Sequence, residues 1–383
     1  MQDPVTGPDP EKYEERIYMN TKEEYWFWLC NIKDIYQDSI HRLLKAFTEP
    51  EEIYKASEDQ LIASGAVDRI RARAIVSSKS SSRCLYRLEK LKMDGTRFIY
   101  YGGEDYPERF MNLEDKPYAF YVKGELPDPV QPTAGIVGAR NCSAYGKEMT
   151  LKFSQTLAAS GIQIVSGLAL GVDTYASKGA LEAGGKTFVV LGSGLDVIYP
   201  TQNIELYYQI IMQGGGIISE FPAGTLPAGW HFPHRNRLIS ALSDKLLVIE
   251  ARRHSGTLST ASHALAQGKD IYALPGRITD PMSEGCNRMI ADGAGVLLDP
   301  SYLLEAYYGS GYADSLSVCG TEGPVPEGNL GKVYAALDYS PKIIDQIVSD
   351  CGLPAEETYA LLSELELEGL CSQVTKDYYV KGA

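Results

Sequence analysis

The chain has 383 residues, of which 44% are hydrophobic and 10% aromatic, so it is long enough for two or three domains with apolar cores. The polar N-terminus and the lack of any apolar run much longer than a strand exclude a signal peptide and a membrane span, so no membrane partner is expected. Seven scattered cysteines without a CxxC pair favour a reducing cytoplasm over a zinc site or a disulfide framework.

The net charge of -14 disfavours a nucleic-acid partner until its distribution is considered. Summed by segment, the formal charge is 0 over residues 134–300, -9 over residues 301–383 and -5 over residues 1–133. The middle segment is therefore the part of the chain that repels a polyanion least, and the C-terminal segment repels one most.

The N-terminal part is expected to be a flexible leader over residues 1–20, followed by a helical domain over residues 21–95 of the SAM or helix-hairpin-helix type. Its turn over residues 63–67 has two interpretations. A helix-hairpin-helix would contact phosphates through Gly65, whereas the favoured interpretation is a tight structural turn. The tyrosines between residues 97 and 123 recur at strand spacing, which favours core packing over base stacking.

Residues 96–300 are expected to form one α/β domain. Short apolar strands alternate with helices beyond Pro132, for example at residues 134–138, 162–165, 187–191, 216–219, 246–249 and 271–274. Continuous apolar strands of this kind are buried on both faces. The sequence therefore predicts an extended Rossmann-like, doubly wound, mostly parallel sheet.

Small residues gather where these strands end. Carboxyl ends of parallel strands meet helix N-termini, whose unpaired N–H groups favour anions, so a phosphate-bearing ligand is expected there. The turns that we expect to line one rim contribute Gly138, Ser143, Ser166, Gly167, Gly192, Ser193, Gly194, Ser255, Gly256 and Thr257. Neither the dinucleotide fingerprint nor a P-loop is present, so the phosphates are not expected to belong to either cofactor class.

Arginines and one aromatic ring accompany the turns. Arg140 stands in the first turn, and Phe232 precedes Arg235 and Arg237 at the start of a short predicted helix. A guanidinium can hold a phosphate or stack on a base, and an aromatic ring can stack a base. This combination is typical of proteins that bind single-stranded nucleic acid.

The same motifs resemble the DNA-processing protein A (DprA/Smf) family over roughly residues 97–300. The matching stretches, in order, are Val137-Gly-Ala-Arg140, Ser143-Ala-Tyr-Gly146, Ser166-Gly-Leu-Ala-Leu-Gly-Val-Asp173, Val190-Leu-Gly-Ser-Gly-Leu-Asp196, Tyr199-Pro200, Phe232-Pro-His-Arg-Asn-Arg237 and Ser255-Gly-Thr-Leu258.

The resemblance implies a homodimeric, non-catalytic protein that binds single-stranded DNA and loads the RecA recombinase. It also implies that the DNA pocket is lined by Arg140, Phe232, Arg235, Asn236 and Arg237. Several relatives have a lysine where this chain has Gly229, and some have one where it has Thr201. We expect Lys186 or Lys178 to compensate for the missing charge.

The alternative is a nucleotide-binding or nucleotide-hydrolysing enzyme of Rossmann-like fold. The stretch from Ser255 to Thr260 lacks the glutamate that a phosphoribohydrolase needs, and Cys142 and Ser143 lack a base at a predictable spacing. His231 and His234 have no acid or cysteine beside them at ligand spacing, so neither a metal nor a cofactor is expected.

The C-terminal part is expected to be a linker over residues 301–327, beginning with a closing helix, and a winged-helix domain over residues 328–383. A winged helix usually suggests duplex DNA. Here no lysine or arginine occurs between Ile343 and Thr375, and the third helix carries five glutamates. An acidic recognition helix binds duplex poorly, so a protein partner is expected for this domain.

Overall fold

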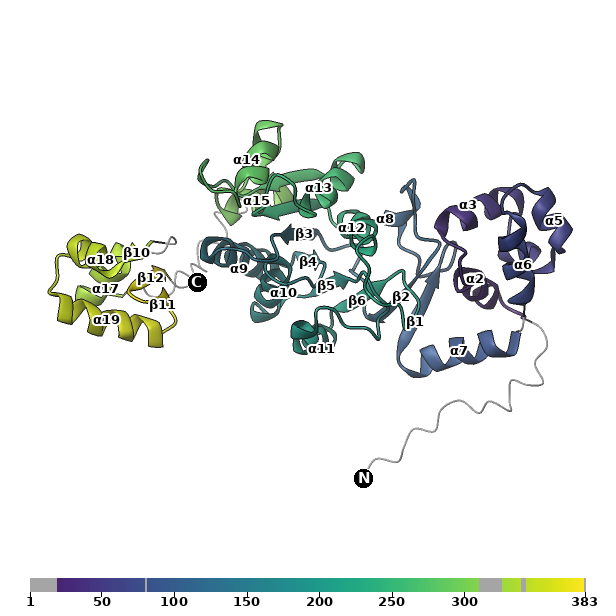
Figure 1. Ribbon diagram of the computed structural model, residues 1–383, viewed down its shortest axis with the longest axis horizontal. Coiled ribbons are helices and arrows are strands. Elements are labelled where there is room, and N and C mark those ends of the chain that lie inside the picture. The colour runs from purple at the N-terminus through teal and green to yellow at the C-terminus, as the bar shows by residue number, and fades with distance from the viewer. Residues whose placement is uncertain (1–18, 80, 310–325, 339–341, 382–383) are drawn as a thin grey trace, which may run out of the picture. The chain divides into compact units, whose positions relative to one another are not determined.

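The computed structural model describes residues 19–79, 81–309, 326–338 and 342–381 (Figure 1). They fall into two compact units. The first combines the described part of Met1–Val130 with Phe188–Leu242, and the second combines Gln131–Thr187 with the described part of Ser243–Ala383. The greater part of the expected leader and of the expected linker lies outside the described residues, whereas the start of the expected linker is helical in α15 (Pro300–Tyr308).

The described part of the first unit opens with six helices. They are α2 (Lys22–Cys30), α3 (Gln37–Ala46), α4 (Pro50–Lys55), α5 (Glu58–Ala63), α6 (Arg69–Ser77) and α7 (Ser81–Met93). Capping residues fix several starts, because Thr21 and Ser57 form capping boxes and the Asp68 carboxylate accepts a hydrogen bond from the Arg71 N–H. Gly65 takes a left-handed φ of 71° between α5 and α6.

Four strands complete this unit in the order β1 (Thr96–Tyr100), β2 (Ala119–Gly124), β6 (Gly216–Ser219) and β5 (Thr187–Val190). β2 pairs antiparallel with both β1 and β6, whereas β5 and β6 are parallel. The sequence did not predict the pairing of β2 with β6, which lie about ninety residues apart. The helices here are α8 (Glu108–Met111), η1 (Thr201–Asn203), α11 (Ile204–Met212) and α12 (His231–Leu242).

Aromatic packing joins the helices of this unit to β1 and β2. The Phe27 ring lies 5.1 Å from the Phe98 ring in an edge-to-face arrangement, and the Asn31 amide donates to the Tyr121 hydroxyl at 2.7 Å. Phe98 and Tyr121 are buried. Tyr106 and Tyr118 are buried as well, so the favoured interpretation of core packing holds for most of these tyrosines, whereas Tyr101 is 38% exposed.

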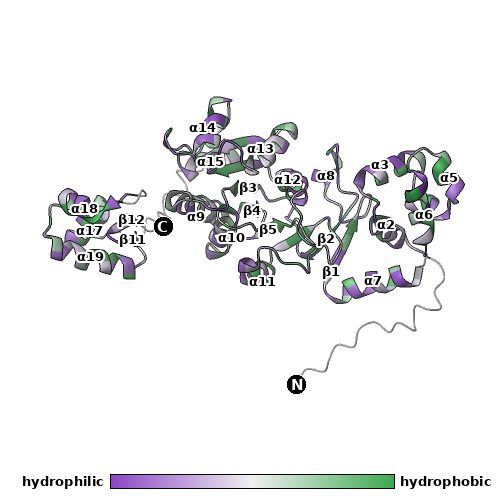
Figure 2. Cartoon of the chain, in the orientation of Figure 1, coloured by the Kyte–Doolittle hydropathy of each residue, from purple (hydrophilic) through white to green (hydrophobic). Residues whose placement is uncertain are grey.

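The second unit contains a parallel array of strands in the order β4 (Gln163–Ser166), β3 (Thr133–Gly138), β7 (Lys245–Ile249), β8 (Asp270–Ala273) and β9 (Gly295–Val296). Its helices are α9 (Ala144–Ala159), α10 (Val172–Glu182), α13 (Thr257–Ala266), α14 (Glu284–Ala291) and α15. The predicted mostly parallel, Rossmann-like fold is confirmed. β3 and β4 are coloured mainly on the hydrophobic side of the scale in Figure 2, as expected of strands buried on both faces.

Close backbone contact explains one glycine of this unit. A Cβ atom at Gly138 would lie 1.8 Å from the carbonyl oxygen of Ile249 on the neighbouring strand β7. Only glycine fits at this end of β3, so Gly138 has a structural reason independent of any ligand.

The described C-terminal residues form a winged helix with its own core. The elements are α17 (Gly328–Ala336), β10 (Lys342–Ile343), α18 (Ile344–Cys351), α19 (Ala355–Leu367), β11 (Cys371–Thr375) and β12 (Tyr378–Lys381). Val333, Ile347, Leu362 and Leu365 are buried in it. The predicted helices and two-stranded wing are present, and a third, unpredicted strand, β10, pairs with β12. None of the helices among the described residues is both long and apolar enough to cross a membrane.

Candidate nucleic-acid interface

The N-terminus of α12 carries the aromatic ring that the sequence singled out. Phe232 is half-buried, and its ring centroid lies 5.9 Å from that of Tyr199, which is 43% exposed. A Cβ atom at Gly192 would lie 2.9 Å from the Phe232 ring, so the absence of a side chain there admits the ring. Phe232, Tyr199 and Gly192 thus form one partly open aromatic site at the end of β5.

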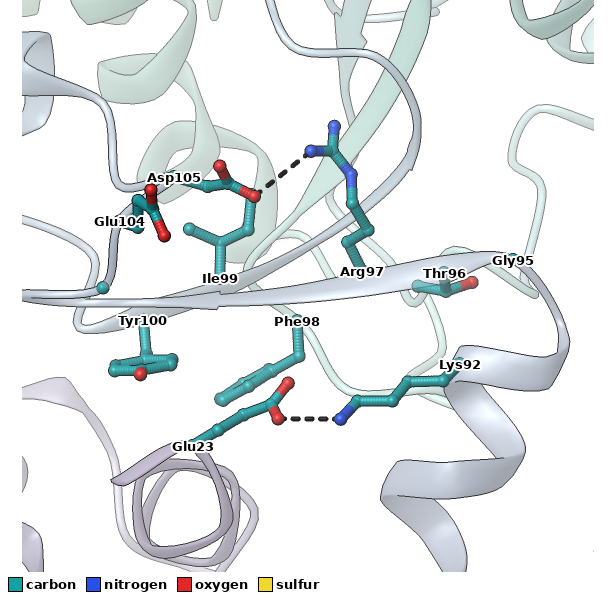
Figure 3. A pocket seen from close by; sticks show the side chains of 11 residues that line it. Glu23, Lys92, Gly95, Thr96, Arg97, Phe98, Ile99, Tyr100, Glu104 and Asp105 are labelled. Carbon is teal, nitrogen blue, oxygen red and sulfur yellow. Dashed lines mark hydrogen bonds and ion pairs between the residues drawn. The ribbon is translucent and has the colours of Figure 1, made fainter. Parts of the chain in front are cut away.

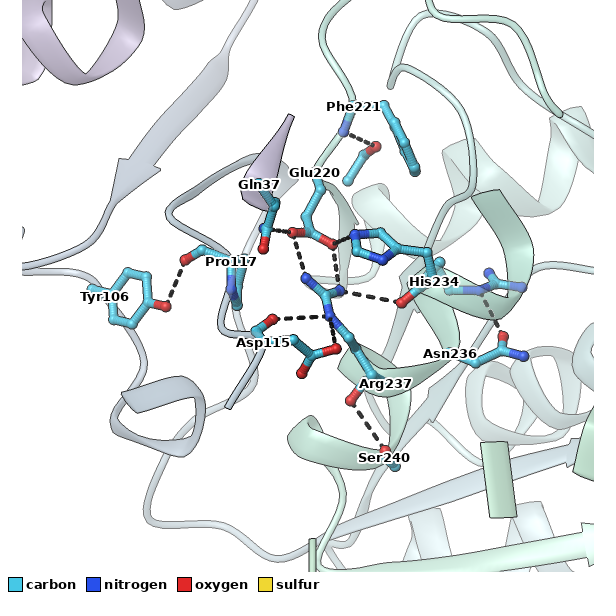
Figure 4. A network of polar contacts seen from close by, with 12 residues as sticks. Gln37, Tyr106, Asp115, Pro117, Glu220, Phe221, His234, Asn236, Arg237 and Ser240 are labelled. Atoms are coloured by element: carbon cyan, nitrogen blue, oxygen red, sulfur yellow. Dashed lines mark hydrogen bonds and ion pairs between the residues drawn. The ribbon is translucent and has the colours of Figure 1, made fainter. Parts of the chain in front are cut away.

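Arg237 lies in a buried ion pair (Figure 4). Its two terminal nitrogens contact the two oxygens of Glu220, at 2.5 and 2.7 Å, and its Nε lies 3.0 Å from an oxygen of Asp115. Burial lowers the pKa of the Arg237 guanidinium, whereas the neighbouring Glu220 carboxylate raises it. The net shift of the Arg237 pKa is upward. Gln37, the first residue of α3, donates to the same Glu220 carboxylate. Arg237 therefore acts as a structural brace in this arrangement.

Arg235 and Asn236 are also buried. The Arg235 guanidinium donates to the Val190 carbonyl oxygen at the end of β5, and its Nε donates to the Asn236 side chain at 3.1 Å. The same guanidinium lies 6.0 Å from the Phe232 ring centroid. These contacts hold the start of α12 against the end of β5.

Two histidines belong to the same helix start. Burial lowers the pKa of both His231 and His234, and it outweighs the opposing effects of the Gly192 carbonyl on His231 and of Glu220 on His234. The His231 Nδ1 lies 2.9 Å from the Gly192 oxygen. In the residues that the structure describes, no three potential metal ligands gather here or elsewhere.

Two small residues of the turn after β5 face the protein. Ser193 is buried and its hydroxyl donates to the Val197 carbonyl at 2.7 Å. A Cβ atom at Gly194 would lie 2.6 Å from the Pro222 carbonyl oxygen. These residues shape the backbone of the turn, and their side-chain positions offer no free donor.

Arg140 is an exposed arginine of the second unit, as are Arg252, Arg253 and Arg277. It follows β3, and its backbone is held by the next turn, because a Cβ atom at Gly171 would lie 2.4 Å from the Arg140 carbonyl oxygen. The Val172 N–H, at the start of α10, donates to the Ala139 oxygen at 3.1 Å. The backbone at Arg140 is therefore held in place, and the residue is exposed.

The start of α9 is occupied by a carboxylate. Glu250, which follows β7 with a left-handed φ of 54°, accepts hydrogen bonds from both the N–H, at 2.8 Å, and the hydroxyl of Ser143. Glu250 is 2% exposed. A helix N-terminus holds an anion here, but the anion is the protein's own, so Ser143 does not offer the phosphate site that its position predicted.

The other predicted turns of the second unit contain both buried and exposed residues. Ser166 and Gly167 are buried, and the Ser166 hydroxyl donates to the Ile136 oxygen at 2.8 Å. The Thr257 hydroxyl donates to the Gly138 oxygen at 3.1 Å. Gly256 is exposed and Ser255 half-buried at the N-terminus of α13, so these two remain accessible.

Lys186 does not lie where the sequence placed it. The Ile164 N–H, near the start of β4, donates to the Lys186 carbonyl at 3.1 Å. Ser166 and Gly167 follow the opposite, carboxyl end of β4. Lys186 directly precedes β5, so it lies at the amino ends of the strands, and this position argues against the expected compensation at the rim.

The candidate nucleophiles are not activated. Burial, with a further contribution from Glu250, raises the pKa of the Cys142 thiol to about 11, so it remains protonated near neutral pH. The Ser143 hydroxyl contacts the Glu250 carboxylate and is also the acceptor that caps α9. Both residues are used by the fold.

A pocket of about 470 Å³ lies along β1 (Figure 3). The ion pair of Glu23 with Lys92 lies on one side of the strand, and the pair of Arg97 with Asp105 lies on the other. None of its lining residues comes from the predicted site. Four of its five charged lining residues form these two ion pairs and Glu104 is the fifth, so the pocket presents charges of both signs.

Comparison with known proteins gives a consistent result. The profile of the family described as DNA recombination-mediator protein A matches residues 97–308, and that of the DprA winged helix domain matches residues 322–375. The chain belongs to the DNA recombination-mediator protein A family. This confirms the resemblance seen in the sequence and makes the protein a member of a DNA-processing family.

Similar proteins extend the match to most of the chain. Protein Smf of Synechocystis sp. is 33% identical over 92% of this chain and 97% of its own length. A crystal structure of DNA processing protein A from Streptococcus pneumoniae is 30% identical, with a TM-score of 0.64 over 75% of this chain and 98% of that one. DNA processing protein A from Helicobacter pylori is 33% identical, with a TM-score of 0.50 over 55% of this chain and 95% of that one, and its structure is described as showing a unique single-stranded DNA binding mode.

Proposed function

We propose that this protein binds single-stranded DNA in the cytoplasm, protects it and loads a RecA recombinase onto it, without catalysing a reaction. Membership of the DNA recombination-mediator protein A family supports this proposal, as does the single-stranded DNA binding described for the Helicobacter pylori relative. The observation in this chain that carries it is the partly open ring of Phe232 beside the exposed Tyr199, since bases stack on such rings.

Different residues have different proposed roles. Arg140, exposed on a fixed backbone, is the proposed phosphate contact, and the backbone of Ser255 and Gly256 supplies further donors. Phe232 is the proposed stacking residue. Arg235, Asn236 and Arg237 are proposed to hold α12 and thereby the Phe232 ring, because their polar groups are buried in contacts with the protein.

A titration of the full chain tests the DNA partner. Fluorescein-labelled single-stranded and duplex oligonucleotides of equal length are titrated at several salt concentrations, with anisotropy as the readout. We expect the single strand to bind more tightly at every salt concentration, because only unpaired bases can stack on an aromatic ring. Equal or tighter binding of the duplex would contradict the proposal.

The recombinase step needs its own assay. RecA filament formation is followed on single strands coated with single-strand-binding protein, and adding this protein should shorten the lag before filaments form. An unchanged lag at saturating protein would refute RecA loading and leave DNA binding standing.

The homodimer is tested separately, by light scattering during size-exclusion chromatography.

Turnover distinguishes the alternative enzyme class. Incubation of the purified protein with nucleoside monophosphates should release neither base nor phosphate, since Cys142 and Ser143 are engaged by the fold. Turnover that survives gel filtration would refute the non-catalytic role.

The winged helix is proposed to bind a protein. Its α19 carries Glu356, Glu357, Glu364 and Glu366, and a helix of this charge repels a phosphate backbone. A variant with lysines in place of Glu356 and Glu357 should gain affinity for duplex DNA. If this variant gains no affinity for duplex DNA, the negative charge of α19 is not the reason for the predicted lack of duplex binding.

A further inference from the structure

Two large aromatic side chains remain exposed next to the start of α12. Trp230 is 58% exposed and Tyr36 is 57% exposed, and their rings meet edge to face with centroids 6.4 Å apart. Tyr36 caps α3 of the helical segment, whereas Trp230 directly precedes α12. Both residues belong to the first unit. Burial of large aromatic rings stabilises a folded chain, so two adjacent rings that stay exposed indicate a surface that binds a ligand.

Trp230 is held in place from below. Its ring centroid lies 4.2 Å from that of the buried His231 and 6.3 Å from that of Phe221, and the Phe221 and His231 centroids are 4.0 Å apart. The His231 Nδ1 is anchored at 2.9 Å from the Gly192 carbonyl oxygen. The indole therefore has a fixed support while more than half of its surface faces solvent, which is the arrangement that stacking a flat ligand requires.

The segment that carries Trp230 adds no negative charge to oppose a polyanion, whereas Tyr36 is flanked by the exposed Asp34 and Asp38. The segment from Phe221 to Ser243 contains no aspartate or glutamate, although the chain as a whole carries a net charge of -14. The same segment leads into the positive end of α12, a helix of twelve residues. Trp230 is also only two residues from Phe232, the ring proposed above to stack a base, and Gly192 contacts both His231 and Phe232.

We infer that Trp230 and Tyr36 form a second stacking site for unpaired bases, which extends the path of single-stranded DNA from Phe232 onto the helical segment. This inference rests on the proposed single-stranded DNA binding and adds to it a ring from α3, a part of the chain to which no DNA contact has been assigned. The ligand class is the nucleobases that flank those held at Phe232.

Tryptophan fluorescence provides a direct measurement. The chain has three tryptophans, and the other two, Trp26 and Trp28, are 4% and 2% exposed. Titration with a twenty-residue oligothymidylate should quench emission in proportion to binding, because a base stacks on the exposed Trp230. An abasic oligomer of the same length should bind more weakly and leave the emission unchanged.

Substitutions test the same site by affinity. Trp230→Ala should weaken binding of the oligothymidylate about tenfold, and Tyr36→Ala about threefold, while neither changes binding of the abasic oligomer. Trp230→Phe should keep affinity within about twofold but abolish the quenching, since phenylalanine also stacks. The double alanine variant should lose less than the product of the two single losses, because the two rings contact each other.

Tyr302, which is 63% exposed on α15, is the matched control, and Tyr302→Ala should bind as the wild type does. Wild-type affinity in Trp230→Ala together with unquenched emission in the wild-type complex would overturn the second stacking site while leaving the proposed function intact. A wild-type protein that binds no oligothymidylate would overturn both.

Discussion

Arg237 and Arg140 were both expected to line the DNA pocket, but Arg237 is buried and Arg140 is exposed. Arg237 is 0% exposed and shares two contacts with the Glu220 carboxylate, whereas Arg140 faces solvent. A guanidinium already satisfied within the fold cannot bind a phosphate without breaking a buried ion pair. An arginine in a DNA-binding motif can therefore stabilise the architecture of the site. Four experiments test this distinction and the site around it.

The largest effect is expected from Arg237→Met. Loss of the guanidinium leaves the buried Glu220 carboxylate without its main partner, so the free energy of unfolding in urea should fall by about 3–5 kcal/mol. Exchange of both Arg237 and Glu220 for apolar residues should recover much of this loss. Arg140→Met is the matched control and should change the free energy of unfolding by no more than about 0.5 kcal/mol. Equal losses in the two single variants would remove the distinction.

Gly192→Ala should have the next largest effect. The added methyl group would lie 2.9 Å from the Phe232 ring and must displace it, at a cost of about 1–3 kcal/mol in the free energy of unfolding. Gly256→Ala is the control, because no atom lies within 4 Å of its added Cβ and its φ is -58°. If both variants melt at the wild-type temperature, the ring is not confined by the turn after β5.

Arg140→Ala should reduce affinity and leave stability unchanged. We expect single-stranded DNA binding to weaken about tenfold, and the slope of log affinity against log salt to become shallower by about 0.7, the value for one phosphate of a single strand. Lys186→Ala, at the amino ends of the strands, should match the wild type in both respects. Anisotropy titrations across salt measure both quantities, and a loss in Lys186→Ala equal to that in Arg140→Ala would count against the assignment.

The smallest effect concerns pH. The folded state lowers the pKa of His231 and His234, so the unfolded chain takes up protons first as the pH falls through about 6.5. The folded state should therefore lose stability between neutral pH and the lowered pKa values, and melting temperatures at pH 7.5 and 5.5 measure that loss. Exchange of both histidines for glutamine should flatten the dependence, whereas the same exchange at the exposed His254 should not. An unflattened dependence would contradict this origin.

Local pattern in the sequence predicted most of the fold. Apolar runs such as residues 246–249 mark buried strands, and Ser57 marks a helix start, because both signals act within a few residues. The pairing of β2 with β6 depends on contacts across about ninety residues, and β9 and β10 have two residues each, too few to show a period. These features had no local signal.

The sequence predicted which residue types the site contains, but not which of those residues are exposed. The sequence placed Arg140 and Phe232 at strand ends and helix starts, and the structure agrees. It did not reveal that Glu250 closes the start of α9, because that contact joins residues 107 positions apart. The aromatic pair of Trp230 and Tyr36 was also missed. The signal was a large apolar side chain in a loop rich in glycine and proline, but its partner lies in a different segment.

The Glu220 carboxylate has a consequence for how single-stranded DNA would dissociate from the protein. Since it neutralises Arg237 inside the fold, the attraction at α12 would come from flat ring surfaces and little from net charge. Counterions compete weakly for such surfaces. We expect a strand held there to withstand salt and to be displaced instead by a complementary strand, because pairing and stacking in a duplex enclose the faces of the bases that the rings require.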